Sequence, residues 1–371
     1  MEKKNGRIVC VAGARPNFMK IAPILDQIRR GGRLEGILLH TGQHYDEAMS
    51  DAFFRDLGLP EPDVHLGVGS ESPVRQTARI LERVEPEFER LAPACVVVVG
   101  DVNSTVASAL AAAKMGIPVA HVEAGLRSRD RTMPEELNRI VTDALSDFLF
   151  TTSRDADENL LLEGVPPGKI HLVGNVMIDT LRRFEERCRS SRILQTIGLS
   201  KHGYALVTLH RPSNVDRRED LERVVAILEG ASLRLPVVFP IHPRTRSRLE
   251  GEGFADRIAA RPGLHLRPPE GYIDFLRLLS AARIVLTDSG GIQEETTVLG
   301  VPCLTLRPNT ERPVTITEGT NRLIGSDPER VLAALDEELA AGREAAPRIP
   351  ALWDGKAAER IVRVLEGAYA A

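Results

Sequence analysis

Short apolar runs alternate with helical stretches along almost the whole chain, and this alternation restricts the fold more than any other feature. Most runs are continuous rather than alternating, which is typical of strands covered on both faces. Strands separated by helices favour parallel, doubly wound sheets. The predicted strands are Ile8–Ala14, Gly36–Thr41, Cys95–Gly100, Pro118–Val122, Phe148–Thr152, Ile170–Val173, Tyr204–Leu209, Pro236–Ile241, Leu264–Leu266, Arg283–Thr287 and Val301–Leu306.

These strands fall into two series, which predict an α/β fold of two Rossmann-like domains. A chain of 371 residues is also too long for one ordinary core. We place the N-terminal domain at 1–174 and the second domain at 175–356. A charged helix, 177–191, follows the boundary without a Ser/Gly linker, so we expect the parallel sheets to face a central cleft. The end of the chain, 357–371, reads as an amphipathic helix.

Composition excludes several classes of protein. The formal net charge is −4 and no dense Lys/Arg tract occurs, which does not suggest a nucleic-acid partner. The first residues lack a signal-peptide pattern, and no apolar run approaches the ~20 residues that span a membrane. The four cysteines form no CxxC pair, so neither a structural zinc site nor a disulfide framework is indicated. We expect a cytoplasmic protein without a metal.

Three carboxylates follow one another in the central stretch 95–139. Asp101 follows an apolar strand, Glu123 ends the next one, and Glu135 opens a helix. Asp101 could instead cap a helix, and Glu135 could simply favour the helix dipole. Glu123 is harder to explain structurally, because a charge at the end of an apolar strand needs a partner. Carboxylates in different environments can act as acid and base at one sheet edge.

The first strand of each series runs into a similar turn, in which Pro follows Arg where a helix should start: 13–17 and 209–214. Arg15 and Lys20 lie at the first helix start and form a candidate anion site. A solvated basic helix start is the alternative. His210 in the second turn is a candidate acid, base or phosphate donor, or else a structural turn residue.

Two further polar turns are equally compatible with binding and with structure. Thr41–Asp46 follows the second strand and could contact a nucleotide or sugar, or cap the next helix through its Asp. His242 and Arg244 follow a strand of the second series and form a candidate ligand contact.

The most specific nucleotide signal is the stretch 286–295, LTDSGGIQEE. Gly290 and Gly291 allow close backbone approach at a helix start, and Ser289 adds a hydroxyl, so the turn could hold a diphosphate. Tight helix–strand packing is the alternative. Glu295, about a turn into the helix, could bind ribose hydroxyls, and Arg312 in the polar loop 309–321 is a second phosphate or sugar candidate. The stretch is neither GxGxxG nor a Walker A loop. We therefore expect a nucleotide-linked substrate.

The motifs together resemble the non-hydrolysing UDP-N-acetylglucosamine 2-epimerases of bacteria and archaea. They occur in order over nearly the whole chain: GARPNFMKIAP, GDVNST, HVEAGLRS, MPEELNR, TLHRPSN, LTDSGGIQEE, and TERP followed by EGTNRLIG. The resemblance implies a GT-B-like fold, a homodimer, and a C-terminal helix that returns to the first domain. It implies no cofactor.

The resemblance also implies a reaction and its residues. The family interconverts UDP-GlcNAc and UDP-ManNAc by eliminating UDP to a 2-acetamidoglucal and adding it back with C2 inverted. By motif position, the catalytic residues would be Asp101, Glu123, Glu135 and His210. The residues that bind UDP would be Arg15, Lys20, Ser289, Glu295 and Arg312, with Phe275 against the uracil.

Departures from the family pattern leave other activities open. Thr41–Asp46 stands where many bacterial members have an AQH turn near an activating second UDP-GlcNAc, and Ser213 replaces the common Glu. TGQHYD and RTMPEE also occur in relatives that act on diacetamido uronic acids. A hydrolysing epimerase and a GT-B glycosyltransferase are the other enzymatic alternatives. An inactive UDP-sugar sensor would have lost the carboxylates, which are intact here.

Overall fold

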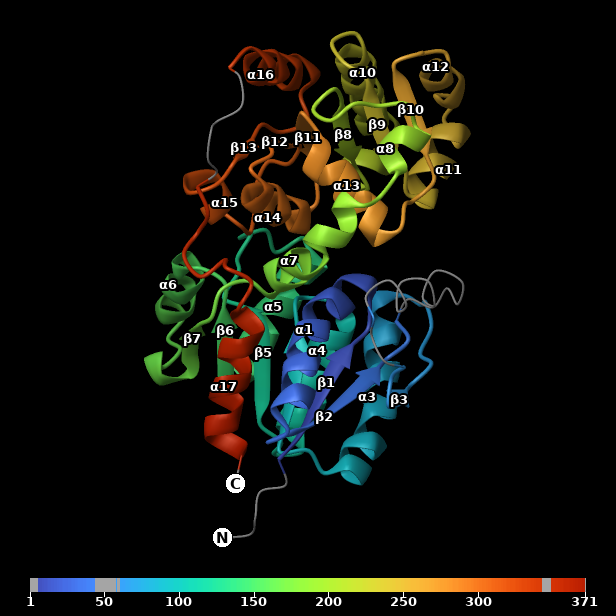
Figure 1. Cartoon of the computed structure of the whole chain (residues 1–371). Helices are drawn as coiled ribbons and strands as arrows, with labels where there is room; N and C mark the ends of the chain where they lie inside the picture. Colours follow the sequence, from blue (N-terminus) through green and yellow to red (C-terminus); the bar gives the residue numbers. More distant parts are fainter. Residues whose placement is uncertain (1–5, 44–57, 59–60, 342–347, 371) are drawn as a thin grey trace. The chain divides into compact units, whose positions relative to one another are not determined.

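The computed structural model describes residues 6–43, 58, 61–341 and 348–370 (Figure 1). The chain divides into two compact units. Unit 1 comprises Met1–Arg183 and Ala351–Ala371, and unit 2 comprises Phe184–Pro350. The chain passes from one to the other inside helix α7 (Val176–Arg189).

Unit 1 contains a seven-stranded parallel sheet of order β3-β2-β1-β4-β5-β6-β7. The chain adds strands outward on one side of β1 and then on the other, so the order reverses between β1 and β4. The strands are β1 (Arg7–Ala12), β2 (Glu35–His40), β3 (Val64–His65), β4 (Cys95–Val99), β5 (Val119–Ala124), β6 (Phe148–Thr151) and β7 (Ile170–Leu172).

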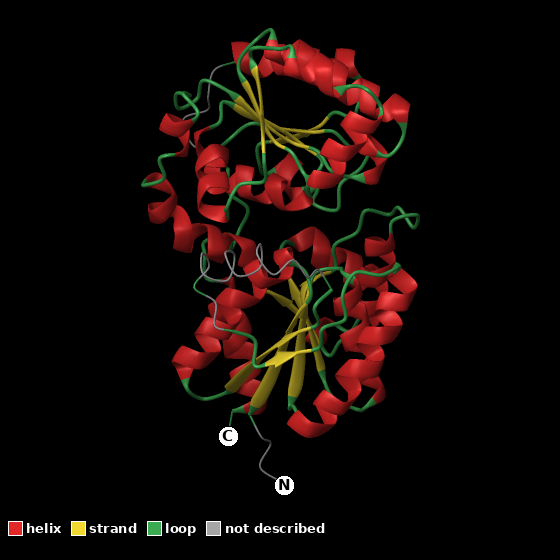
Figure 2. Ribbon diagram, turned by 90° about the vertical axis from the view of Figure 1, so that its right-hand side faces the viewer, coloured by secondary structure: helices red, strands yellow, loops and turns green. Residues whose placement is uncertain are grey.

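Helices cover both faces of this sheet, as Figure 2 shows. Helices α3, α4 and α5 pack in a row, and α1 packs against α17. Val9, Val11 and Val119 of the sheet share one apolar cluster with α3 and α4, which identifies the strand face on that side. The helices are α1 (Arg15–Gly31), α3 (Pro73–Leu91), α4 (Asn103–Lys114), α5 (Pro134–Leu145), α6 (Arg154–Leu162), η1 (Pro167–Lys169), α7 and α17 (Ala357–Tyr369).

The C-terminal segment is held in unit 1 by buried polar contacts. The Asp179 carboxylate of α7 accepts hydrogen bonds from the backbone N–H groups of Ala357 (3.1 Å) and Ala358 (2.7 Å) at the start of α17. Trp353 is buried and donates from Nε1 to the Thr152 carbonyl at 2.9 Å. Residues at the end of the chain thus complete a unit that begins at its start.

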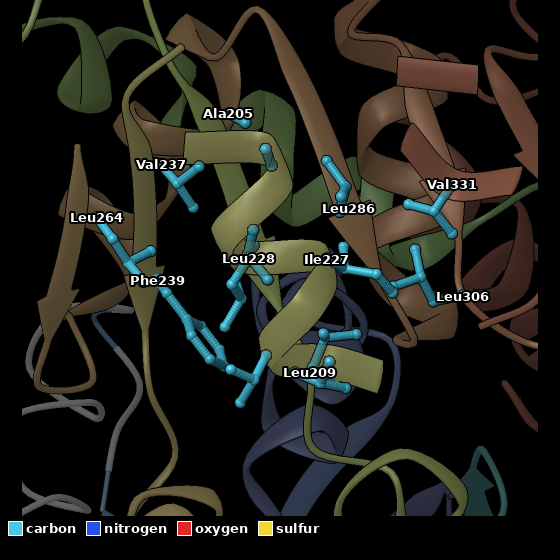
Figure 3. Packing of buried hydrophobic residues seen from close by; sticks show 14 of the residues in the cluster. Ala205, Leu209, Ile227, Leu228, Val237, Phe239, Leu264, Leu286, Leu306 and Val331 are labelled. Atoms are coloured by element: carbon cyan, nitrogen blue, oxygen red, sulfur yellow. The ribbon is translucent and has the colours of Figure 1, made fainter. Parts of the chain in front are cut away.

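Unit 2 contains a six-stranded parallel sheet of order β10-β9-β8-β11-β12-β13. Side chains of these strands and of α10 meet in the apolar core of Figure 3. The strands are β8 (Ala205–Thr208), β9 (Val237–Pro240), β10 (Leu264–Arg267), β11 (Ile284–Thr287), β12 (Cys303–Thr305) and β13 (Asn321–Leu323). The helices are α8 (Ile193–Thr196), α9 (Pro212–Val215), α10 (Arg218–Ser232), α11 (Pro243–Gly251), α12 (Ala255–Ala259), α13 (Tyr272–Ala281), α14 (Gly290–Leu299), α15 (Val314–Thr317) and α16 (Pro328–Ala340).

The predicted α/β class with two parallel, doubly wound sheets is confirmed, and two strands were missed. β3 has only two residues, too few to show a pattern. β13 begins at Asn321, inside the stretch that we expected to be a polar loop. The buried Asn321 amide donates to Gln293 Oε1 and Thr315 Oγ1, both at 3.1 Å, so its polarity is satisfied inside the fold. In the described part of the chain, no helix is long and apolar enough to span a membrane.

Candidate active site

Several residues singled out in the sequence follow the strands that flank the point of reversed order in each sheet, among them Arg15, Asp101, His210 and Ser289. In doubly wound sheets this is the point where ligands bind, at the carboxyl ends of the strands. The two similar turns follow β1 and β8, and Asp101 and Asp288 follow β4 and β11. As predicted, a helix starts at each turn, with Arg15 opening α1 and Pro212 opening α9.

Glu123, at the end of β5, has a left-handed backbone with φ of 68°, where the register with β6 shifts. In a regular strand its side chain would lie on the same face as those of Val119 and His121, toward α4. Instead its carboxylate forms an ion pair with Lys20 of α1, and both residues are buried. A left-handed backbone in a residue with a side chain costs on the order of 1 kcal/mol or more and often marks functional sites.

Gly100 lies directly against this ion pair. A Cβ at this position would be 3.3 Å from both Glu123 Oε2 and Lys20 Nζ, and its φ of 66° also favours glycine. Asn17 holds α1 in place beside it, because its amide donates to the Val99 carbonyl at 3.0 Å and its Oδ1 accepts from Ala14 N at 2.9 Å. The carboxyl ends of β4 and β5 are therefore held at the start of α1.

Asp101 is partly exposed and forms an ion pair with Arg139 of α5. The buried Arg139 guanidinium also pairs with Glu136, at 2.6 Å between Nη2 and Oε2. Glu136 accepts hydrogen bonds from the backbone N–H groups of Ser128 and Arg129, each at 2.9 Å. Burial would raise the pKa of Glu136, but Arg139 and these N–H groups outweigh it and lower the pKa. Sequence reasoning missed this clamp, although the pair is spaced i, i+3 on one helix.

Glu135 lies in the first turn of α5 and is partly exposed. Unlike Asp101 and Glu123, it has no hydrogen-bond or ion-pair partner among the residues that the structure describes. A carboxylate in the first turn is stabilised by the helix dipole and can remain ionised without a counterion. Of the three predicted carboxylates, two are therefore held by cations and one is available to a ligand.

His121 is a buried histidine that sequence reasoning did not single out. Its Nδ1 lies 2.6 Å from Asp143 Oδ1, and its Nε2 lies 2.8 Å from the Gly100 carbonyl oxygen. Asp143 also pairs with Arg127 at 2.7 Å, and Arg127 pairs with Glu163 at 2.6 Å. Burial would raise the pKa of Asp143, but His121 and Arg127 outweigh this and lower it. Its position between apolar residues of β5, in VAHVEA, was the available signal.

In unit 2 the buried carboxylate of Asp288 organises the turn after β8. It accepts from the backbone N–H groups of His210 (3.0 Å) and Arg211 (2.9 Å) and from the Asn214 amide (3.0 Å). The His210 ring lies 3.3 Å from Asp288 through Nδ1, and half of the side chain is exposed. His210 thus presents Nε2 from a fixed turn, the arrangement that an acid, a base or a phosphate donor requires.

Ser289 is the N-cap residue of α14, and its side chain makes no capping hydrogen bond. Nothing in the described chain lies within 4 Å of a Cβ built on Gly291, so the backbone of this turn is open. Gly290 differs, because a Cβ there would collide with the Arg312 guanidinium. Gly291 therefore leaves room for a ligand, and Gly290 leaves room for the Arg312 side chain.

Arg312 is buried, with its guanidinium held between two carboxylates. Nε lies 2.6 Å from Glu294 Oε1 and Nη1 lies 2.6 Å from Glu311 Oε1. Arg307 pairs with Glu311 from the other side at 2.8 Å. The two carboxylates therefore fix the orientation of the Arg312 guanidinium beside Gly290, at the start of α14.

Glu295 is buried in α14 and receives a hydrogen bond from Tyr272 Oη at 3.3 Å. Burial, with a smaller contribution from the charge of Glu294, raises the pKa of Glu295 to about 8. Phe275 lies on α13 one turn after Tyr272 and is half-buried. A carboxyl group that is protonated at neutral pH can donate as well as accept hydrogen bonds.

His242 caps α11, because its Nδ1 accepts from Arg244 N at 3.2 Å. Arg244 is exposed and pairs with Asp216 at 2.6 Å. The rings of His210 and His242 lie 6.5 Å apart, so both face one region of unit 2. His242 and Arg244 thus have partners within unit 2, and both stay candidates for contact with a ligand.

The turn Thr41–Asp46 is described only in part. Gln43 is buried, and its Oε1 accepts from Ser104 N (3.1 Å) and Ser104 Oγ (2.7 Å) at the start of α4. His44, Tyr45 and Asp46 lie outside the described residues. Among the residues that are described, no group of three or more His, Cys, Asp or Glu side chains could hold a metal ion.

Comparison with known proteins decides the family. The family model described as UDP-N-acetylglucosamine 2-epimerase matches residues 26–366. The chain belongs to the UDP-N-acetylglucosamine 2-epimerase family. This membership confirms the predicted resemblance and makes the protein an epimerase, a class of isomerase.

Archaeal and bacterial relatives cover nearly the whole chain. The UDP-N-acetylglucosamine 2-epimerase of Methanocaldococcus jannaschii is 40% identical over 97% of this chain and 98% of its own length. A Pseudomonas aeruginosa relative, UDP-2,3-diacetamido-2,3-dideoxy-D-glucuronate 2-epimerase, is 39% identical over 92% of this chain and 98% of its own. A crystal structure of the M. jannaschii epimerase with UDP-GlcNAc and UDP matches with a TM-score of 0.90 and 38% identity over 97% of this chain and 99% of that one.

Proposed function

We propose that this epimerase interconverts UDP-GlcNAc and UDP-ManNAc without hydrolysis, by eliminating UDP to a 2-acetamidoglucal and adding it back with C2 inverted. The C2 proton is not next to a carbonyl group, so its removal alone gives no stabilised carbanion. Loss of the anomeric C–O bond as the proton leaves avoids that intermediate. The reaction then needs a base near C2, cations for the departing diphosphate, and exclusion of water.

The observation that carries this proposal is the pairing of carboxylates with buried cations in unit 1. Glu123 pairs with Lys20 and Asp101 pairs with Arg139. A carboxylate held beside a cation is a group that can take up a proton as a general base. The unpaired Glu135 completes the set of acid and base groups. Because neighbouring carboxylates influence one another's protonation, the uptake of the C2 proton is assigned to the set of three and not to one residue.

In this proposal unit 2 holds the nucleotide. The open backbone at Ser289 and Gly291 would receive the diphosphate, with the Arg312 cation as a further partner. Glu295 would bind the ribose, and Phe275 would lie against the uracil. His210 would assist departure and return of UDP as an acid or base. His242 and Arg244 would add outer contacts to the substrate.

A UDP-2,3-diacetamido uronic acid is the second candidate substrate. The Pseudomonas relative that carries this activity in its name is as similar, at 39%, as the M. jannaschii UDP-N-acetylglucosamine 2-epimerase, at 40%. The same C2 chemistry serves both sugars, because the reacting centre carries an acetamido group in each. The groups at C3 and C6 decide between them.

The test is proton NMR of the purified protein with UDP-GlcNAc in D₂O, without added metal or acceptor. The proposal expects UDP-ManNAc with deuterium at C2. Free ManNAc and UDP would instead assign a hydrolysing epimerase. No reaction with UDP-GlcNAc, together with deuterium exchange in UDP-2,3-diacetamido-2,3-dideoxy-D-glucuronate, would reject the first substrate in favour of the second.

We also propose that the protein is a homodimer, as the family resemblance implies, and that it works in the cytoplasm, as four cysteines without a CxxC pair favour. Light scattering during size-exclusion chromatography measures the mass in solution. The chain has a mass of 40.7 kDa, so a dimer would appear at about twice that value.

A further inference from the structure

His121 is buried at the carboxyl edge of the unit 1 sheet, and the proposed reaction gives it no role. Both of its ring nitrogens face hydrogen-bond acceptors. Nδ1 faces the Asp143 carboxylate at 2.6 Å, and Nε2 faces the Gly100 carbonyl at 2.8 Å. A neutral imidazole has one N–H and one bare nitrogen, so it could satisfy only one of these contacts.

The surroundings of Asp143 disfavour the other way to satisfy both contacts, which is a protonated Asp143 that donates to His121. Asp143 Oδ1 faces His121, and Oδ2 receives the Arg127 guanidinium (2.7 Å) and Gly125 N (3.1 Å). A guanidinium and a backbone N–H both favour the ionised carboxylate. The ring that satisfies every contact carries two protons and a positive charge.

Gly100, the acceptor of the second ring proton, connects His121 to the candidate catalytic groups. The opposite side of Gly100 lies against the Glu123–Lys20 ion pair, and the next residue is Asp101. Gly100 has a positive φ, and glycine is conformationally freer than any other type of residue. The orientation of its peptide groups therefore depends on the contacts that they make. Its N–H donates to the Val122 carbonyl at 3.0 Å, and its carbonyl is held by His121.

We propose that His121 is a positioning residue whose imidazolium, held by Asp143, fixes the Gly100–Asp101 turn and so aligns Asp101 and Glu123 for the reaction. The chain of contacts runs from Glu163 through Arg127 and Asp143 to His121. Along this chain negative and positive side chains alternate, and each buried side chain has its hydrogen-bond or ion-pair partner within the chain. The consequence for the reaction rests on the proposed epimerisation, whereas the protonation of the ring does not.

The first test is ¹⁵N NMR of the full-length protein labelled at histidine and free of substrate. The chain has nine histidines, and the signals of His121 are those that disappear in His121→Gln. We expect two proton-bearing ring nitrogens at pH 7.5. One protonated and one bare nitrogen would overturn the proposal. In Asp143→Asn the counterion is lost, and we expect one ring proton to be lost with it.

The second test separates positioning from binding and from folding. His121→Gln should reduce kcat by about 10- to 100-fold with KM changed by less than about threefold, because misplacement of catalytic groups by about 1 Å has effects of this size. His171→Gln is the matched control, since His171 is a partly buried histidine of the same sheet, on β7. It should retain kcat.

The two tests also distinguish this inference from the proposed function. If the wild-type protein turns over the diacetamido uronate and not UDP-GlcNAc, the first substrate assignment is rejected. The NMR result, and the kcat ratio measured with that sugar, would still test the role of His121. Wild-type kcat in a folded His121→Gln variant would reject the positioning role alone. If His121→Gln fails to fold, the His121 signals are assigned as those that no substitution of the other eight histidines removes, and the ring protons of the wild-type protein then decide.

Discussion

Glu295→Gln should make unit 2 more stable at neutral pH, by an amount that follows from the burial of this carboxyl group. Burial raises the pKa of Glu295 to about 8 in the folded protein, against the ordinary value of 4.5 for an unburied Glu. Between these two values the unfolded chain releases the proton while the folded chain keeps it. The free energy of unfolding therefore falls by about 1.4 kcal/mol for each pH unit from 4.5 to 8.

At pH 7 this effect amounts to about 3 kcal/mol, because the pH is 2.5 above the lower value. Glutamine has nearly the same shape and still offers an oxygen to the Tyr272 hydroxyl, but it has no proton to lose. We therefore expect Glu295→Gln to match the wild-type protein near pH 4.5. At pH 7 the variant should be more stable by about 3 kcal/mol.

Urea unfolding at pH 5 and pH 7 measures this difference. Far-UV circular dichroism follows both units, and the fluorescence of the single tryptophan, Trp353, follows unit 1 alone, so the transition of unit 2 can be separated. Glu222→Gln, an exposed change in α10 of the same unit, is the control and should leave the pH dependence unchanged. A stability difference between Glu295→Gln and wild type that is equal at both pH values would refute the reasoning.

Five other substitutions have defined outcomes. Asp101→Asn and Glu123→Gln should abolish epimerisation while UDP binding, measured by calorimetry, stays within about threefold; near wild-type turnover in either variant would reject the proposed roles. Gly290→Ala should weaken UDP binding by about tenfold or more, because its methyl group would displace the Arg312 guanidinium. Gly291→Ala would meet no atom of the described residues within 4 Å, so it should leave the melting temperature unchanged or raised. Arg139→Met should destabilise unit 1 by about 3–5 kcal/mol in urea unfolding, because it leaves buried carboxylate charge without a partner; a cost below 1 kcal/mol would contradict this.

The sequence predicted most of the fold because the central strands are apolar runs with clear ends. β4 (Cys95–Val99) is an example, since five buried apolar residues stop at a glycine. β13 could not be predicted in the same way. Its first residue, Asn321, is polar, and its burial depends on partners in α14 and α15 that only the folded chain brings together.

The positions of the candidate residues were predictable, but their partners were not. Strand ends and helix starts placed Asp101, Glu123 and Glu135 at one edge of a parallel sheet. The partner of Glu123 is Lys20, separated from it by 103 positions, and local pattern carries no information about such a pair. His121 was missed for the same reason. In a strand predicted to be buried, its two acceptors come from another strand end and from α5.

The left-handed backbone at Glu123 has a consequence for attempts to make this protein more stable. Glycine adopts this conformation without strain, but Glu123→Gly alone would leave the buried Lys20 ammonium without its counterion, which costs more than the strain it relieves. Replacing Lys20 by Met at the same time would remove both buried charges and relieve the backbone. A selection for thermal resistance that ignores turnover would therefore change the two positions together. Selection for both properties would keep the strained carboxylate with its cation and gain stability elsewhere. The pair of residues 20 and 123 therefore marks where stability and turnover make opposite demands on the chain.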